Sequence, residues 1–327
     1  MVVHTRFAPS PTGRLHLGHA WSVIQAHDFA RAAGGQFTLR IEDIDGTRSR
    51  PEHVEAILRD LEWLGLAWDG EVTFQSRRLV LYEDALDRLR AMGLLYPCFC
   101  TRADIAASLT APHGPDGALY PGTCRALAAP DLSKPHCWRL DMAKALKILP
   151  ELCSGRGTIR AANGGGAAGE DGGVPPPPLH HRPAAGGPPP RDELGEDFLY
   201  WHDAFAGRIL ADPASAGDVV LARKDAPASY HLAVTVDDAA QGITHVVRGV
   251  DLFAATHVHR LLQALLALPT PEYRHHPLLL GPDGTRLAKR HGAPSLEAMR
   301  LAGEDGRALA ERLREGQLPV GIAAAQA

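Results

Sequence analysis

The sequence has 327 residues, of which 45% are hydrophobic and 22% charged, and its formal net charge is -4 at pH 7. No run approaches the ~18 apolar residues that a membrane helix needs, and the opening residues lack the layout of a signal peptide. We therefore expect a globular protein of the cytoplasm, without membrane association. Five cysteines, an odd number, argue against a disulfide framework and leave metal binding or simple burial open. The weak net acidity does not exclude a nucleic-acid partner, which needs only a local basic surface.

The first 97 residues alternate between strand and helix patterns. Residues 2–8 form an apolar run, a turn rich in Gly and Pro follows, and apolar residues at helical spacing continue to Gly34. Residues 36–45 alternate apolar and polar side chains and end in acidic residues, which predicts a strand. Two more helices are expected from Pro51 and from Ser76. This alternation predicts an α/β fold with a doubly wound, Rossmann-like parallel sheet, in which ligands bind at the C-terminal ends of the strands.

The later part of the chain divides by composition. Cysteines and turn residues in 98–147 suggest a subdomain inserted between residues 1–97 and 197–300, the two halves of the α/β core. In the second half three apolar runs, 217–225, 230–238 and 243–249, are predicted as strands, and a helix is predicted over 251–268. Residues 275–284 suggest a strand and a tight turn, followed by a basic loop at 285–292. A single helical pattern is expected near the end, with residues 301–327 as a C-terminal helix and tail.

Residues 148–196 fit neither half. Between 155 and 190, half of the residues are Gly or Pro, a composition that cannot bury enough apolar surface to offset its ordering entropy. We expect a disordered or extended loop there. An inserted low-complexity loop and a local reading-frame slip in the gene both remain open as its origin.

Two distant stretches point to phosphate chemistry. RFAPSPTGRLHLGH, residues 6–19, places a Gly- and Pro-rich turn and two histidines at a helix start, where unsatisfied N–H groups can bind an anion. RLAKR, residues 286–290, supplies a lysine that can bind phosphate oxygens as a point charge. Either stretch alone has an ordinary structural explanation as a strand-to-helix turn or a basic loop.

Together they resemble the two signature motifs of class I aminoacyl-tRNA synthetases. His16-Leu17-Gly18-His19 is similar to the HIGH motif, and residues 286–290 are similar to the KMSKS loop, with Ala288 where that loop has serine. The resemblance implies a synthetase catalytic core that binds ATP, with Mg2+, through His16, Gly18, His19 and Lys289. Of these, His16, His19 and Lys289 would act in catalysis.

Within class I the chain resembles the glutamyl branch over most of residues 3–147 and 197–300. The resemblance implies an L-glutamate site formed by Arg6, Phe7, Ala8, Pro9, Ser10, Glu42, Tyr230 and Arg248. Guanidinium groups suit the two carboxylates of glutamate, and Glu42 offers a negative charge to its ammonium group. The structural alternative for each arginine is an ordinary ion pair.

The cysteines suggest a zinc site. Cys98, Cys100 and Cys124 provide three of the four ligands of tetrahedral zinc, and they lie in a segment short of apolar core. A buried trio of small apolar side chains is the alternative. Cys-x-Cys followed by Tyr-x-x-x-Cys resembles the pattern of the glutamyl-queuosine tRNA(Asp) synthetases, which implies Tyr120 as fourth ligand. Cys137, His113 and His136 remain rivals for that position.

The length favours the same relatives, because the 36 residues after the lysine loop are too few for a helical anticodon-binding domain. The resemblance implies tRNA-independent activation of glutamate and its transfer to queuosine at the wobble position of tRNA(Asp), by a monomer with one structural zinc. Two alternatives are a minimal glutamyl-tRNA synthetase that charges tRNA(Glu) and a non-catalytic RNA-binding relative. A fourth possibility is another nucleotidyltransferase with the histidine motif, which would need neither Glu42 nor Arg248.

Overall fold

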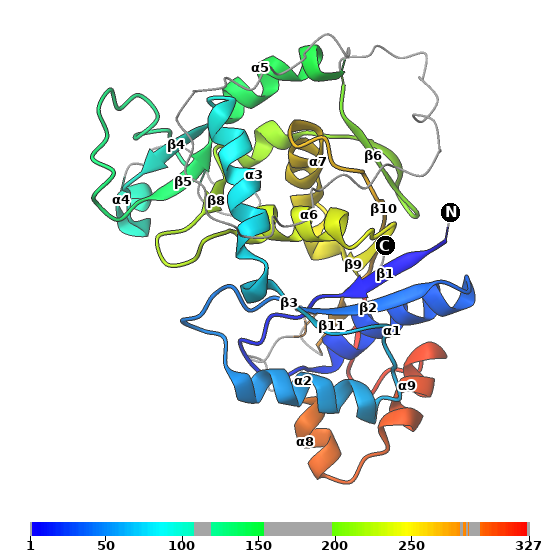
Figure 1. Ribbon diagram of the computed structural model, residues 1–327. Helices are drawn as coiled ribbons and strands as arrows, with labels where there is room; N and C mark the ends of the chain where they lie inside the picture. Colours follow the sequence, from blue (N-terminus) through cyan, green and yellow to red (C-terminus); the bar gives the residue numbers. More distant parts are fainter. Residues whose placement is uncertain are drawn as a thin grey trace, which may run out of the picture.

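A computed structural model of the chain describes residues 2–107, 119–153, 198–281, 284–285, 287 and 295–325, and shows parallel sheets with helices on both faces (Figure 1). Lys289 and the Gly- and Pro-rich residues 155–190 lie outside the described residues. No helix within the described ranges is long and apolar enough to cross a membrane.

Two central sheets adjoin each other. In one, β1, β2 and β3 pair in parallel; in the other, β9, β10 and β6 pair in parallel, and β7 is an antiparallel edge strand. The amide of Thr244, just before β9, donates to the carbonyl of His4 in β1 at 3.0 Å, so the two sheets meet at these strands. The bounds are β1 His4–Phe7, β2 Gln36–Ile41, β3 Thr73–Phe74, β6 Tyr200–Asp203, β7 Gly207–Leu210, β9 His245–Gly249 and β10 Glu272–His276.

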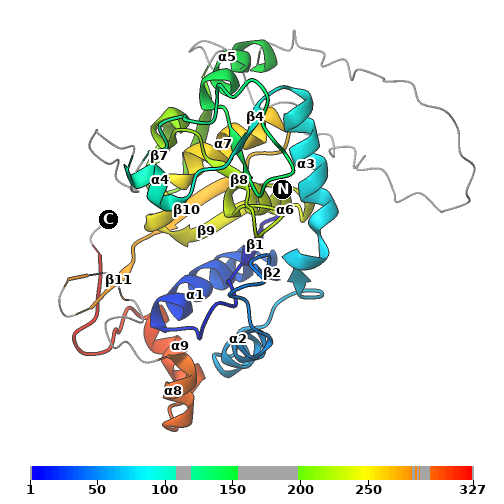
Figure 2. The same cartoon turned by 90° about the vertical axis from the view of Figure 1, so that its left-hand side faces the viewer.

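The helices form two layers, visible in two views (Figures 1 and 2). α1 packs on β1, β2 and β9, and it shares one apolar core with α2, α8 and α9. α3, α5, α6 and α7 share a second core on the opposite side. The bounds are α1 Leu17–Ala32, α2 Pro51–Trp63, α3 Leu79–Ala91, α5 Met142–Cys153, α6 Tyr230–Ala240, α7 Ala255–Leu265, α8 Leu296–Leu301 and α9 Gly306–Arg314.

A third, antiparallel sheet lies beside α3 and contains Cys98 and Cys137. Its order is β4-β5-β8, so a strand from residues 197–300 completes a sheet begun in residues 95–140. The remaining elements are small: β4 Leu95–Cys98, β5 Cys137–Leu140, β8 Val220–Ala222, α4 Arg102–Ala107, the hairpin β11 Leu279–Leu280 with β12 Ala323–Ala324, and the 3-10 turns η1 Gln75–Arg77, η2 Pro213–Ala216 and η3 Val250–Leu252.

Several predicted elements are confirmed. A helix begins at Pro51, β2 buries Phe37, Leu39 and Ile41, and the runs 217–225 and 243–249 contain β8 and β9. The helix predicted from Ser76 begins slightly later, at Leu79, after the 3-10 turn η1. The helix predicted over 251–268 is shorter, as α7.

The prediction of a strand over 230–238 was wrong, because these residues form helix α6. All residues from Leu232 to Asp238 are buried, so the helix has no polar face that would reveal its period. Two sequence signals do mark its ends: Ser229 at the N-cap position, and Gly242, whose φ of 66° suits the residue that follows a helix.

The prediction of one helical pattern at the C-terminus was also wrong, since α8 and α9 are separate. Gly303 has a φ of 85°, a left-handed conformation that ends α8. The Asp305 carboxylate then accepts the N–H groups of Arg307 and Ala308, at 2.9 and 3.1 Å, and starts α9. The α5 helix likewise continues beyond residue 148, where the sequence suggested that regular structure stops.

Candidate active site

A cavity of about 420 Å³ opens where the C-terminal ends of β1 and β9 meet the start of α1. This is the position at which ligands bind in doubly wound sheets. The cavity brings together every predicted ATP and glutamate residue in the described part of the chain. Its lining includes Arg6, Phe7, Ala8, Pro9, Ser10, His16, Gly18, His19, Glu42, Tyr230 and Arg248.

The two motif histidines cap the helix that they begin. His16 is the N-cap residue of α1, and its Nδ1 accepts the N–H of Gly18 at 3.1 Å. The Nδ1 of His19 accepts the N–H of His16, also at 3.1 Å. Because an accepting Nδ1 carries no proton, each neutral ring has its proton on Nε2. Both rings therefore have an N–H donor in the cavity.

The chain just after the lysine loop lies against these histidines. Ser295 forms an isolated antiparallel bridge with His16, and the Leu296 amide donates to the Leu15 carbonyl at 2.9 Å. Leu279, which precedes the loop, and Leu287, within it, line the cavity. The described residues that flank Lys289 in sequence thus lie beside the histidine motif.

Arg6 already has a counter-charge. Its Nε and Nη2 donate to the two carboxylate oxygens of Asp238, at 2.9 and 3.3 Å. Asp238 also accepts from Arg40, at 2.8 Å, and Arg40 is completely buried. Although burial alone would raise the pKa of Asp238, the two guanidinium groups hold it below its usual value.

Asp237 extends this cluster away from the cavity. Its carboxylate accepts from Gln75 at 2.8 Å, from Arg78 at 2.6 Å and from the hydroxyl of Tyr82 at 2.8 Å. It also lies 3.8 Å from the Nε of Arg40. The sequence analysis did not identify Arg40, Asp237 or Asp238 as part of the site; the acidic pair at the end of the predicted strand 230–238 was the only available signal.

Glu42 lies at the end of β2 and faces the cavity. Its amide donates to the Pro9 carbonyl at 3.0 Å, and its carboxylate is 3.8 Å from Arg40. Burial raises the pKa of Glu42 to about 7, against the opposing effect of Arg40 and Arg6. A ligand ammonium group beside this carboxylate would favour its charged form.

Arg248 differs from Arg6 in having no carboxylate partner in the described part of the chain. The side chain is buried, lines the cavity, and donates from Nη1 to the Tyr230 hydroxyl at 3.3 Å. Its other acceptors are imidazoles, a carbonyl and a hydroxyl, and no carboxylate among the described residues pairs with it. The sequence analysis did not identify the two histidines in this group, His259 and His275, because one is in a helix and the other in a strand with no motif around it.

The ring of Tyr230 forms part of the cavity surface. The residue is the first of α6 and is 37% exposed, and this exposure is explained by the cavity that it lines. Close backbone approach shapes the neighbouring wall, since a Cβ on Gly249 would lie 2.5 Å from Asp251 and 2.7 Å from Leu278. Any larger residue at 249 would therefore displace the wall.

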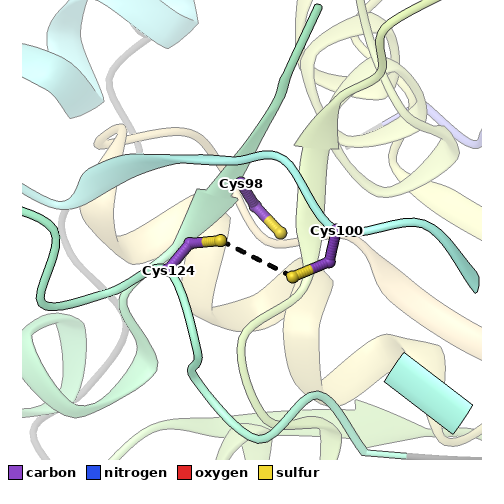
Figure 3. Close-up of side chains that lie close together, drawn as sticks. All are labelled: Cys98, Cys100 and Cys124. Carbon is purple, nitrogen blue, oxygen red and sulfur yellow. Dashed lines mark hydrogen bonds between the residues drawn. The ribbon is translucent and has the colours of Figure 1, made fainter. Parts of the chain in front are cut away.

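Three cysteines converge at a second place, at the end of β4 (Figure 3). The sulfur atoms of Cys98, Cys100 and Cys124 all lie within 4.8 Å of one another, and those of Cys100 and Cys124 are 3.5 Å apart. Ligand sulfurs at the Zn–S distance of about 2.3 Å in a tetrahedron lie about 3.8 Å from each other. The donor set therefore fits a zinc ion.

The candidates for the fourth zinc ligand lie in different surroundings. The Tyr120 hydroxyl is 3.7 Å from the Cys100 sulfur and accepts the Cys124 amide at 2.8 Å. The Cys137 thiol instead donates to the Cys98 carbonyl at 3.4 Å, and the Nδ1 of His136 is 2.8 Å from the Lys134 carbonyl. His113 lies outside the described residues. Tyr120 thus contacts both Cys100 and Cys124, whereas Cys137 contacts Cys98, through its side chain as well as its carbonyl, and His136 contacts a backbone carbonyl.

Comparison with known proteins agrees with this geometry. The family model described as tRNA synthetases class I (E and Q), catalytic domain, matches residues 2–131 and 193–320. A glutamyl-Q tRNA(Asp) synthetase of Rhodobacter capsulatus is 45% identical over 304 residues, which cover 91% of this chain and 95% of the relative. The protein of that name from Symbiobacterium thermophilum is 42% identical over 308 residues, covering 91% and 81% respectively.

Among solved structures, a glutamate tRNA ligase from Elizabethkingia meningosepticum, in complex with its amino acid, superimposes with a TM-score of 0.62 at 25% identity. The match covers 89% of this chain and 53% of that one, so the chain spans about half the length of the solved ligase. The predicted class I synthetase catalytic fold, with its mixture of sheets and helices, is confirmed. The chain belongs to the class I tRNA synthetases of the E and Q group and, within them, to the glutamyl-Q tRNA(Asp) synthetases.

Proposed function

We propose that this chain activates L-glutamate with ATP, without tRNA, and transfers the glutamyl group to queuosine at the wobble position of tRNA(Asp). One observation carries the proposal: the cavity that contains the two histidine donors also contains Arg248, a buried cation without a counter-ion among the described residues. Such a cation favours the binding of an anionic ligand in the same cavity as the two histidines. The names of the relatives supply the acceptor.

Activation needs no protein nucleophile. A carboxylate oxygen of the glutamate α-carboxyl group attacks the α-phosphorus of ATP, and the bond to the bridging oxygen of the β-phosphate breaks. Glutamyl-adenylate forms and pyrophosphate leaves; the Mg2+ that accompanies ATP would offset negative charge in this step. His16 and His19 donate from Nε2 as negative charge grows on the phosphates, and Lys289 binds the departing pyrophosphate.

The residues of the proposed glutamate-binding site differ in the part of the substrate that they contact. With the α-carboxylate directed to the α-phosphate near the histidines, the γ-carboxylate points toward Tyr230 and Arg248. Glu42 accepts the substrate ammonium group, and the segment from Arg6 to Ser10 forms the wall beside it. A hydroxyl of the queuosine cyclopentenediol then attacks the acyl carbon, an ester forms, and AMP leaves.

We further propose a structural zinc ion held by Cys98, Cys100, Cys124 and Tyr120. It would join the end of β4 to the segment after residue 119, where the described chain has only a small apolar cluster. We propose that the active form is a monomer. Because its substrates are ATP and tRNA, we assign the reaction to the cytoplasm.

Isotope exchange between ATP and pyrophosphate, measured without tRNA over a panel of amino acids, tests the activation step. Exchange with glutamate, and none with glutamine or aspartate, is the expected result. Exchange that appears only after tRNA(Glu) is added would instead favour a minimal glutamyl-tRNA synthetase. Absence of exchange under both conditions would favour a non-catalytic RNA-binding relative.

A further inference from the structure

The contacts of Arg248 use all of its hydrogen-bond donors, and no carboxylate among the described residues pairs with its charge. Nε donates to Nε2 of His275 at 3.1 Å, and Nη1 donates to Tyr230 and to Nδ1 of His259, both at 3.3 Å. Nη2 donates to the Leu252 carbonyl at 3.1 Å and to the Thr256 hydroxyl at 2.6 Å. A guanidinium has five N–H donors, so each of them has an acceptor.

These contacts fix the protonation of both histidines. Arg248 can only donate, so Nε2 of His275 and Nδ1 of His259 must offer lone pairs. The proton of His275 is then on Nδ1, which lies 2.8 Å from the carboxylate of Asp203. The proton of His259 is on Nε2, which lies 3.2 Å from Nδ1 of His231. Each neutral ring directs its proton away from Arg248.

Burial and charge favour the same neutral forms. Burial, followed by the nearby Arg248, lowers the pKa of His275 to about 4 and that of His259 well below its usual value. Asp203, the carboxylate at the far side of His275, accepts four N–H groups, from the ring and amide of His275 and from the amides of Phe205 and Ala206. It is separated from the guanidinium by the imidazole ring.

We propose that His259 and His275 determine substrate specificity through Arg248: they hold it with lone pairs alone, so that its positive charge selects a γ-carboxylate over a γ-carboxamide. This inference rests on the proposed function and deepens it. A glutamine side chain has the same shape as glutamate, and both can accept a hydrogen bond from the Tyr230 hydroxyl, so that bond alone does not separate them. A cation without a counter-ion attracts the carboxylate strongly and the neutral amide only weakly.

Tyr230 makes the direct contact. Its oxygen accepts from Arg248, so its O–H is directed elsewhere, and the ring forms part of the cavity surface. The hydroxyl can therefore donate to the ligand carboxylate while Arg248 supplies the charge behind it. Arg248 need not break its own hydrogen bonds in order to bind substrate.

A matched pair of variants at residue 259 separates charge from hydrogen bonding. The side-chain oxygen of Asn or Asp can occupy the position of Nδ1, so His259→Asn supplies a neutral acceptor and His259→Asp supplies a charged one. In glutamate-dependent exchange, we expect His259→Asp to raise KM for glutamate by about 10- to 100-fold, with kcat and KM for ATP little changed. His259→Asn should restore KM to within about threefold of the wild-type value, and the ratio of glutamate to glutamine activation should follow the same order.

Equal KM values for the Asn and Asp variants would overturn the inference. Because the Asp variant could fail to fold, a second test uses the wild-type protein. Long-range 1H–15N NMR spectra of the imidazole rings are recorded at pH 7. The His259 signals are identified as those that disappear in His259→Asn. The expected signals are those of a neutral ring with its proton on Nε2; a doubly protonated ring, or a proton on Nδ1, would overturn the inference. Lack of glutamate-dependent exchange by the wild-type protein would instead refute the proposed function on which it rests.

Discussion

The ring of His19 accepts the backbone N–H of His16 through Nδ1 at 3.1 Å, while the ring of His16 accepts the N–H of Gly18. The motif therefore has two separable roles: its Nδ1 atoms cap α1, and its Nε2 atoms carry the ring protons that we propose act in catalysis. Each role predicts a different effect of substitution.

Replacing His16 by Asn should keep the N-cap of α1 and remove the imidazole N–H donor. The Asn oxygen can accept the Gly18 amide, and Asn is among the best N-cap residues, so the free energy of unfolding should change by less than about 0.5 kcal/mol. The rate of glutamyl-adenylate formation should fall by about 10²- to 10³-fold, as for other lost transition-state donors. Urea unfolding and ATP–pyrophosphate exchange measure the two effects.

The control is His16→Ala, which removes both roles. It should lose a similar factor in rate and also about 0.5–2 kcal/mol of stability. Unimpaired exchange by His16→Asn would show that the Nε2 proton does not contribute to catalysis.

Glutamate binding should strengthen as pH rises through 7. The pKa of Glu42 in the free protein is about 7, so at pH 6 most molecules carry a neutral carboxyl group opposite the substrate ammonium. At pH 8 most carry the carboxylate. The Kd for glutamate, measured by calorimetry, should therefore fall by about tenfold between pH 6 and pH 8.

The Glu42→Gln variant is the control for this profile. It should bind glutamate weakly at both pH values and show no such slope, because no charge appears. A wild-type Kd that is constant over the same range would mean that Glu42 does not titrate there or does not contact the ammonium group.

Asp238 should be essential for stability as well as for the site. It is the counter-charge of both Arg6 and Arg40, and Asp238→Asn would leave two buried cations with reduced compensation. Breaking a buried ion pair by removing one partner costs about 3–5 kcal/mol. The matched control is Asp225→Asn, whose partner Arg223 is partly exposed; this change should cost no more than about 1 kcal/mol. Similar urea midpoints for both variants would contradict the assignment of Asp238.

Zinc content should depend on the three converging cysteines and not on Cys137. We expect about one zinc per chain in protein purified under reducing conditions. Cys100→Ser should lower the zinc content, and Cys137→Ser, whose thiol contacts the Cys98 carbonyl, should retain it. Tyr120→Phe should weaken zinc retention against a chelator if the hydroxyl is the fourth ligand. Zinc-free wild-type protein, or zinc loss in Cys137→Ser, would contradict the proposed site.

The sequence predicted well those parts of the molecule in which local pattern and three-dimensional role coincide. Strand β2 shows an apolar alternation because Phe37, Leu39 and Ile41 face one core. The residues in and after β1 and at the start of α1 belong to motifs, and those assigned to ATP or glutamate in the described part of the chain all line one cavity.

Long-range charge compensation could not be predicted in this way. Arg40 lies on the face of β2 opposite its apolar residues and would be expected in solvent, yet it is completely buried because both faces of an interior parallel strand are covered. Its partner Asp238 is about 200 residues away in sequence, on a helix that was predicted as a strand. The histidines around Arg248 were missed for the same reason, since only the tertiary fold brings α7 and β10 to β9.

The most direct test of the central claim is the acceptor of labelled glutamate. Three purified tRNAs are compared after incubation with the protein, ATP and Mg2+: tRNA(Asp) that contains queuosine, the same tRNA without it, and tRNA(Glu). We predict label only on the queuosine-containing tRNA(Asp). Label on tRNA(Glu), or equal label on tRNA(Asp) with and without queuosine, would contradict the proposed function.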